Sequence, residues 1–178
     1  AFEGCTSLKT VIIPKKITKI PDYCFSGCSS LEDIQINKTN PVSCEIGSYA
    51  FKDCTAIKKL GNVEKDTSGN IKTITDSLNV TTIGDYAFSG CTGIKIAVLP
   101  KSVTKVGDSA FSGCSSLVEI YFRYYNDSTG IADDGPDIHE KAFPDTKVRG
   151  QAVIYGYDGK VKEYAQDENH KFKSYISL

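Results

Sequence analysis

A short motif occurs six times along this chain, and its recurrence constrains the fold more than any other feature. It reads AFEGCTSL at residues 1–8. It returns with small changes at residues 24–31, 50–57, 87–94 and 110–117, and a shortened copy lies at 142–146. The motif phenylalanine recurs after 23, 26, 37, 23 and 32 residues. A base period of 23 residues, with three longer steps, indicates a stack of repeated coils rather than one globular core.

The part of each unit that follows the motif predicts two short strands. In the first unit, Leu8, Val11 and Ile13 have the spacing of a short strand with one buried face, and Pro14 ends it. A second extended piece follows at residues 17–20. One coil cannot bury its own apolar side, so we expect stacked coils whose strands pair in parallel about 4.8 Å apart.

Composition excludes several classes of protein. Hydrophobic residues make up 40% and charged residues 24%, which excludes a disordered chain. The net charge of -1 predicts no nucleic-acid partner, and no apolar run approaches the ~18 residues that a membrane span needs. Residue 1 falls inside a repeat unit, so we expect a fragment of a longer protein. We expect its natural C-terminus at residue 178, without an anchor or lipidation signal.

The whole unit resembles the BspA-like leucine-rich repeat. Residues 87–109 match its pattern almost position for position, with Ala97 in place of a larger aliphatic residue. The resemblance implies an α/β leucine-rich-repeat solenoid of short parallel strands and short 3-10 or helical turns, wound as a right-handed superhelix. It also implies a bacterial or protist protein at the cell surface or secreted, without catalytic repeat residues. Some members of that family are adhesins.

The chain is predicted to divide into repeats at residues 1–147 and a C-terminal cap at 148–178. The repeats comprise about five coils and a decayed sixth, with insertions near residues 37–45, 61–75 and 123–137. The run Thr67-Ser68-Gly69-Asn70 lies between alternating segments, so the second insertion is predicted to form a hairpin.

The predicted cap contains one helix between two strands. Val161, Tyr164 and Ala165 have helical spacing within residues 159–168. Residues 153–157 and 171–176 alternate as strands. Such a cap covers the apolar ladder and strand edge that the last coil would otherwise expose.

The cysteines admit three interpretations. Five of them follow the motif phenylalanine by three residues: Cys5, Cys28, Cys54, Cys91 and Cys114. A metal site or a disulfide ladder is one possibility, but ligands strung along an axis do not converge on an ion, and five in a row leave one unpaired. We favour small buried side chains in the stack. Cys24 is also predicted to be buried, whereas Cys44, in an insertion, is predicted to be the exposed thiol.

No other pattern predicts catalysis or a cofactor. His139 and His170 have no Ser or Cys partner at motif spacing. The cluster at residues 133–137 lacks the spacing and terminal Glu of a calcium loop, so we interpret it as a solvated acidic loop. Glycosylation sequons start at Asn37, Asn79 and Asn126, and they matter only in a eukaryotic secretory protein.

Residues between the buried strand positions are predicted to face outward on the inner curve of the solenoid. These pairs are Thr10 and Ile12, Asp33 and Gln35, Lys59 and Gly61, Ile96 and Val98, and Glu119 and Tyr121. Phe122 is in the buried register. Tyr and Arg are enriched at binding hot spots, so a partner-binding patch is predicted, with ordinary strand packing as the alternative. Its residues are Tyr121, Arg123, Tyr124, Tyr125, Ile96 and Val98.

The predicted function is a non-enzymatic interaction module, adhesin-like, that binds a protein or glycan as a monomer. A solenoid presents an extended surface, and its insertions vary that surface. The alternative is a structural spacer within a larger surface protein. No metal, cofactor or catalytic residue is predicted.

Overall fold

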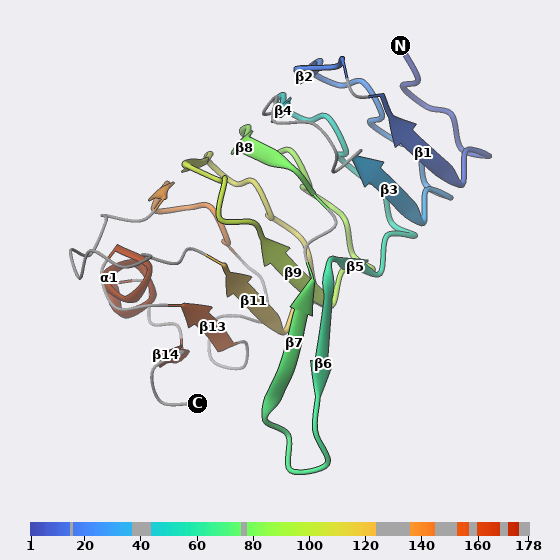
Figure 1. Ribbon diagram of the computed structural model, residues 1–178. Helices are drawn as coiled ribbons and strands as arrows, with labels where there is room; N and C mark the ends of the chain where they lie inside the picture. The colour runs from blue at the N-terminus through green and yellow to red at the C-terminus, as the bar shows by residue number, and fades with distance from the viewer. Residues whose placement is uncertain are drawn as a thin grey trace.

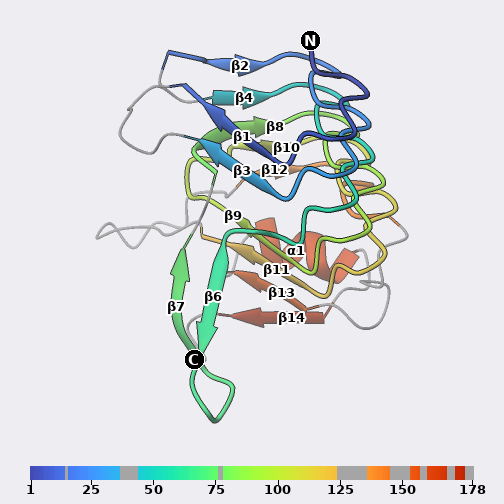
Figure 2. The same cartoon turned by 90° about the vertical axis from the view of Figure 1, so that its right-hand side faces the viewer.

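The chain folds into a stack of coils with two columns of short parallel strands (Figure 1). The computed structural model describes residues 1–14, 16–36, 44–75, 78–123, 136–144, 153–156, 160–167 and 171–174. Column A contains β1 (Thr10–Ile13), β3 (Asp33–Ile36), β5 (Lys59–Leu60), β9 (Ile96–Leu99), β11 (Glu119–Phe122), β13 (Val153–Gly156) and β14 (Lys171–Ser174). Column B contains β2 (Lys19–Ile20), β4 (Cys44–Ile46), β8 (Val80–Ile83), β10 (Lys105–Val106) and β12 (Asp137–Ile138). In Figure 2 the strands lie one below another, from β2 and β4 at the top to β13 and β14 at the bottom.

The two columns are the two strands predicted for each repeat unit. Every pairing within a column is parallel, and strands of neighbouring coils align in register, for example Tyr121 with Val98 and Val106 with Ile83. The stack of coils predicted from the repeat is therefore confirmed. In β11 the side chain of Phe122 is buried, also as predicted.

The motif residues form a third side of each coil, where phenylalanine rings stack. The rings of Phe25, Phe51, Phe88 and Phe111 lie in one row with centroids 5.3 Å apart at each step. The offset, nearly parallel arrangement is favourable for aromatic rings. Backbone bonds hold the same turns together: the Phe51 amide donates to the Ala87 carbonyl at 2.8 Å, as its counterparts do in the neighbouring coils. The motif turn thus carries the contact between coils.

Four of the five motif cysteines, Cys28, Cys54, Cys91 and Cys114, are buried beside this row, and their thiols donate to backbone carbonyls. Cys91 Sγ donates to the Phe51 carbonyl of the preceding coil at 3.1 Å, and Cys114 Sγ donates to the Phe88 carbonyl at 3.2 Å. All seven cysteines are free. Cys24 is buried as predicted, whereas Cys5 is exposed because it lies in the first described coil.

The prediction that Cys44 is the exposed thiol is wrong. Cys44 begins β4, where its side chain is 1% exposed and packs in the main core. Its Sγ donates to the Glu45 carbonyl at 3.7 Å. The insertion therefore ends before Cys44, and the cysteine occupies an inward position of column B.

Burial makes these thiols unreactive, which predicts a simple labelling result. A thiol reacts as the thiolate and needs access to the reagent, and burial raises the pKa of both Cys54 and Cys114 to about 12. At pH 8 we expect a disulfide reagent to label Cys5 rapidly in the folded protein, and all seven cysteines after denaturation. The Cys5→Ser variant should lose the rapid phase. A second rapid thiol in that variant would contradict the buried row.

The segment predicted to be the cap contains a strand, a helix and a strand in the predicted order. Helix α1 (Lys160–Asp167) follows β13, and Val161, Tyr164 and Ala165 are buried against the last coil. β13 and β14 extend column A beyond β11. The cap thereby continues the parallel sheet while its helix covers the end of the apolar ladder.

The second insertion forms the predicted hairpin. β6 (Asn62–Lys65) and β7 (Ile71–Thr75) pair antiparallel and project from the end of β5 (Figure 1). At Gly61, φ is +87°, and a Cβ there would lie 2.6 Å from Val98 Cβ. Glycine is required at this position because it adopts positive φ readily and leaves room for Val98. The hairpin is thereby directed over the outward face of column A.

Candidate functional site

The hairpin covers the outward face of the later coils. Val98, Tyr121 and Tyr155 form a small second core, and the hairpin residues Val63, Ile71 and Ile74 pack against it. Val98 and Tyr121 are both 0% exposed. The prediction that these two side chains face outward on an open sheet is therefore wrong. Their register is as predicted, but the insertion folds back onto them.

Polar contacts at the edge of this second core hold the hairpin in place. Lys65 Nζ of the hairpin forms an ion pair with Glu119 of β11 and lies 5.9 Å from the centroid of the Tyr155 ring. Tyr121 Oη donates to Glu119 Oε2 at 3.0 Å, and the Tyr121 ring stacks on Tyr155 with centroids 4.4 Å apart. Burial, followed by the nearby Glu119 charge, raises the pKa of Tyr121 far above its usual value. Tyr121 is therefore a neutral, packed side chain.

The other residues of the predicted binding patch lie around this covered area. Ile96 is half-buried and packs against the second core, whereas Arg123 is exposed at the end of β11. Tyr124 and Tyr125 lie outside the described residues. A role of any of these side chains in binding stays a prediction.

The outward face of the first coils is open. Ile12 of β1 is 63% exposed, and Thr10, Asp33, Gln35 and Lys59 are exposed beside it. Gln35 Nε2 donates to Asp33 Oδ2 at 2.6 Å across the surface of β3. Of the outward pairs predicted from the strand register, those in the first two coils and Lys59 of the third are thus accessible. Gly61, the other residue of the third pair, is buried at the base of the hairpin, so the prediction that it faces outward is wrong.

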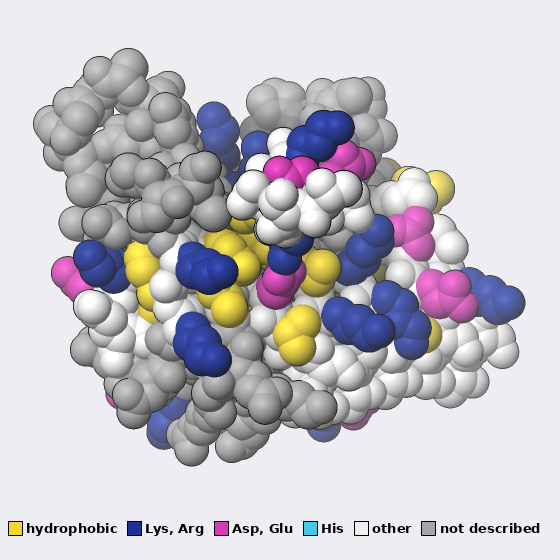
Figure 3. Space-filling view, turned by 90° about the horizontal axis from the view of Figure 1, so that it is seen from below, with side chains coloured by type: hydrophobic (Ala, Val, Ile, Leu, Met, Phe, Trp, Pro, Cys, Tyr) yellow, Lys and Arg dark blue, Asp and Glu magenta, His cyan; other side chains and the backbone are white. Residues whose placement is uncertain are grey.

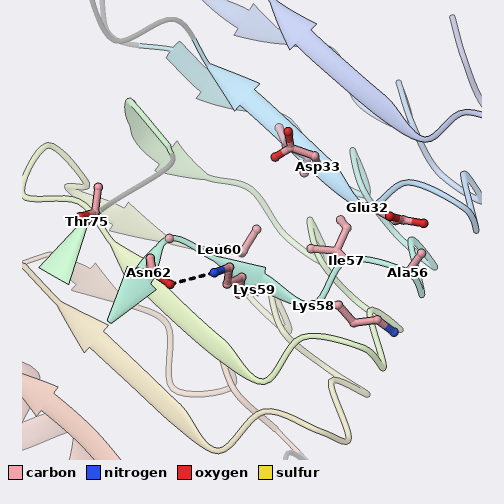
Figure 4. A pocket seen from close by; sticks show the side chains of 11 residues that line it. Glu32, Asp33, Ala56, Ile57, Lys58, Lys59, Leu60, Asn62 and Thr75 are labelled. Carbon is pink, nitrogen blue, oxygen red and sulfur yellow. Dashed lines mark hydrogen bonds between the residues drawn. The ribbon is translucent and has the colours of Figure 1, made fainter. Parts of the chain in front are cut away.

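A groove of about 640 Å³ lies where the open face meets the hairpin (Figure 4). It is lined by Glu32, Asp33, Ile34, Ala56, Ile57, Lys58, Lys59, Leu60, Gly61, Asn62 and Thr75. Glu32 and Asp33 form one wall and Lys58 and Lys59 the other. Lys59 Nζ donates to Asn62 Oδ1 at 2.7 Å, which joins this wall to the start of the hairpin.

The family of the chain follows from its repeats. The profile described as "BspA type Leucine rich repeat region" matches residues 1–67 and 64–132, with six copies. The chain belongs to this BspA-type family. No curated protein sequence matches it.

Several solved structures are similar to this BspA-type chain, to different degrees. The T. pallidum leucine-rich repeat protein is 20% identical with a TM-score of 0.57, over 97% of this chain and 76% of that one. A leucine-rich repeat protein from Bacteroides ovatus is 23% identical with a TM-score of 0.41, over 89% of this chain and 36% of that one. The pneumococcal vaccine antigen PcpA is 15% identical with a TM-score of 0.46, over 93% and 41%. The first of these likenesses supports the leucine-rich-repeat solenoid.

The described residues offer little for nucleophilic or metal chemistry in this BspA-type solenoid. His139 Nδ1 lies 3.7 Å from Asp108 Oδ1 at an exposed site and accepts a hydrogen bond from the Lys141 amide at 3.2 Å. No group of three or more His, Cys, Asp or Glu side chains able to hold a metal ion occurs within the described ranges. Residues 133–135 and His170 lie outside those ranges. In the same ranges, no helix is long and apolar enough to cross a membrane.

Strand register predicts that the groove residues Asp33 and Lys59 face outward, but it does not predict the groove itself. One feature of the sequence could have indicated the groove. Gly61-Asn62 comes directly after Leu60, so the insertion begins only two residues into the strand. On the lower face of the molecule, basic and acidic side chains are interspersed among small hydrophobic areas (Figure 3). That mixture does not form the single-sign surface that a polyanion would need.

Proposed function

We propose that this chain is a non-enzymatic interaction module of a cell-surface or secreted protein. It binds a protein or glycan ligand on the open outward face of its first coils. The observation that carries the proposal is the division of column A, whose later half is covered by the hairpin and whose first half presents Ile12 at 63% exposure beside polar groups. Interfaces combine an apolar centre with a polar rim, and Ile12 with its polar neighbours has this arrangement. The surface location rests on the family resemblance.

The covered residues do not serve as direct contacts in this proposal. The hairpin packs over Val98 and Tyr121, so a ligand cannot reach either side chain. Arg123 and the segment that follows it stay candidates for a contact at the edge of the covered half. A catalytic role finds no support, because four of the five motif thiols are buried and hydrogen-bonded to carbonyls.

Binding to an array of extracellular-matrix proteins and glycans tests the proposal. The Ile12→Arg variant should bind the captured ligand at least about tenfold more weakly, because burying one large apolar side chain contributes roughly 1.5–3 kcal/mol. Val118→Arg is the matched control, since Val118 is an exposed apolar residue outside the open face, at 39% exposure. Equal binding by the Ile12→Arg variant and the unaltered chain would place the ligand elsewhere.

The same array distinguishes the alternative function, a structural spacer. A spacer needs a rigid stack of coils but no ligand, so it would bind nothing on the array. The mixed charge and the exposed Ile12 favour the interaction module. If the unaltered chain binds nothing on the whole array, the spacer is favoured.

A further inference from the structure

The parallel ladder of column A is interrupted once within the described chain, between β3 and β5. β1 pairs with β3, and β5, β9, β11, β13 and β14 pair in that order, but β3 and β5 belong to different sheets. At the neighbouring steps a backbone amide donates to the preceding coil: Glu32 to the Lys9 carbonyl and Lys95 to the Lys58 carbonyl, both at 2.8 Å. No corresponding bond joins Lys58 to Glu32 in the described segments.

The interruption is one-sided, because the same two coils are in close contact at their motif turns. The Phe25 amide donates to the Ala50 carbonyl at 2.8 Å, and the rings of Phe25 and Phe51 stack with centroids 5.3 Å apart. On the column A side, β5 ends at Leu60 because Gly61 turns the chain into the hairpin. The two coils therefore touch at their motif turns and diverge toward column A. This leaves a wedge-shaped gap between β3 and β5, called the wedge below, and the groove lies at its wide end.

The interruption leaves a strand edge beside the groove. In a parallel ladder the N–H and C=O groups of one residue point to the same neighbour, and those of the next residue point to the other. Asp33 N–H points back toward Lys9, at 3.3 Å from its carbonyl. The N–H and C=O groups of Ile34 therefore point toward the wedge, where β5 supplies no partner strand.

The side chains around this edge define the chemistry of what fits there. Ile34, Ile57 and Leu60 are buried and form an apolar floor, at 4%, 1% and 1% exposed. The repeat register places Asp33 opposite Lys59, yet no ion pair joins them within the described residues. The walls thus carry balanced opposite charges, and the groove contains no aromatic ring on which a sugar could stack.

We propose that this groove binds an extended peptide segment of near-neutral charge, which adds along the edge of β3 that no described strand pairs with. Main-chain hydrogen bonds to Ile34 give affinity, as in strand addition at other sheet edges. An apolar peptide side chain packs on the floor, while basic and acidic side chains meet Asp33 and Lys59 respectively. A polyanion is disfavoured by the carboxylates of Glu32 and Asp33. This inference rests on the proposed interaction function and names its ligand class and site.

Selection from a phage-displayed library of linear random peptides tests the inference. An enriched peptide is synthesised with a fluorophore, and its affinity is measured by polarisation. Asp33→Lys and Lys59→Glu should each weaken binding by about tenfold or more, because each change replaces an attractive charge pair at the interface with a repulsive one. Glu45→Lys on β4 and Lys105→Glu on β10 make the same charge changes on exposed positions of column B and should leave the affinity unchanged. Amide exchange at Ile34 and Lys59 should slow when the peptide is bound.

Three outcomes would overturn the inference. They are a selection without enriched peptides, equal affinities for the Asp33→Lys and Glu45→Lys variants, and unchanged amide exchange at Ile34. If the chain still captures a ligand from the matrix and glycan array, only the peptide groove is refuted. If the chain also binds nothing on that array, both the peptide groove and the proposed interaction function are refuted.

Discussion

Replacing Phe88 with alanine should lower the free energy of unfolding by about 3–5 kcal/mol. Phe88 is 0% exposed, and its ring stacks on those of Phe51 and Phe111 with centroids 5.3 Å away on either side. Alanine would remove both contacts and leave a cavity in the middle of the row. The surrounding turns cannot collapse into that space easily, because backbone hydrogen bonds set the spacing between coils.

Phe2 provides the matched control for this substitution. It occupies the same motif position in the first coil, but it is 48% exposed and stacks on Phe25 alone. We expect Phe2→Ala to cost about 1 kcal/mol, since little apolar area is lost from a buried environment.

Urea denaturation followed by circular dichroism and by tyrosine fluorescence measures both variants. Repeat arrays can unfold in stages, so coincidence of the two signals decides whether one free energy describes the transition. Similar losses for Phe2→Ala and Phe88→Ala would mean that the phenylalanine row does not hold the coils together.

The Gly61→Ala variant should lose about 2–4 kcal/mol of stability and displace the hairpin. Positive φ at a non-glycine residue costs about 1 kcal/mol, and overpacking a filled site adds about 1–3 kcal/mol. The new Cβ would lie 2.6 Å from Val98 Cβ and 2.7 Å from the Thr75 carbonyl oxygen, so β7 or β9 would have to move.

Gly69→Ala separates the conformational cost from the steric one. Gly69, at the hairpin turn, also has positive φ, at +85°, but a Cβ there meets nothing within 4 Å. We expect that variant to lose only about 1 kcal/mol. Amide exchange of Val98 and Tyr121 should accelerate in Gly61→Ala and stay slow in Gly69→Ala. Equal exchange in the two variants would show that the hairpin does not depend on the space at Gly61.

The order of elements was predictable because each depends on local pattern. The 23-residue period and the spacing of apolar residues predicted both strand columns, and the hairpin followed from the alternating segments around Gly69. Helical spacing of Val161, Tyr164 and Ala165 predicted α1. The burial of Cys44 was missed because the length of an insertion does not show where the next inward position begins.

The accessible surface was less predictable than the fold. Strand register predicted correctly that Ile12, Asp33 and Lys59 point outward, and it made the same prediction for Val98 and Tyr121. The latter two are buried because residues 63–74, far from them in the sequence, cover them. Register specifies which face of a strand a side chain occupies, but not what packs on that face.

The sequence by itself determined a repeated coil, because one coil buries its apolar side only against another copy of the same pattern. The phenylalanine row, the buried motif cysteines and the parallel columns all follow from that requirement. Only the tertiary structure decided which part of column A stays open. The direction of the hairpin depends on one backbone conformation at Gly61 and on contacts with Tyr121 and Tyr155. Those contacts join segments far apart in the chain, and no local pattern encodes them.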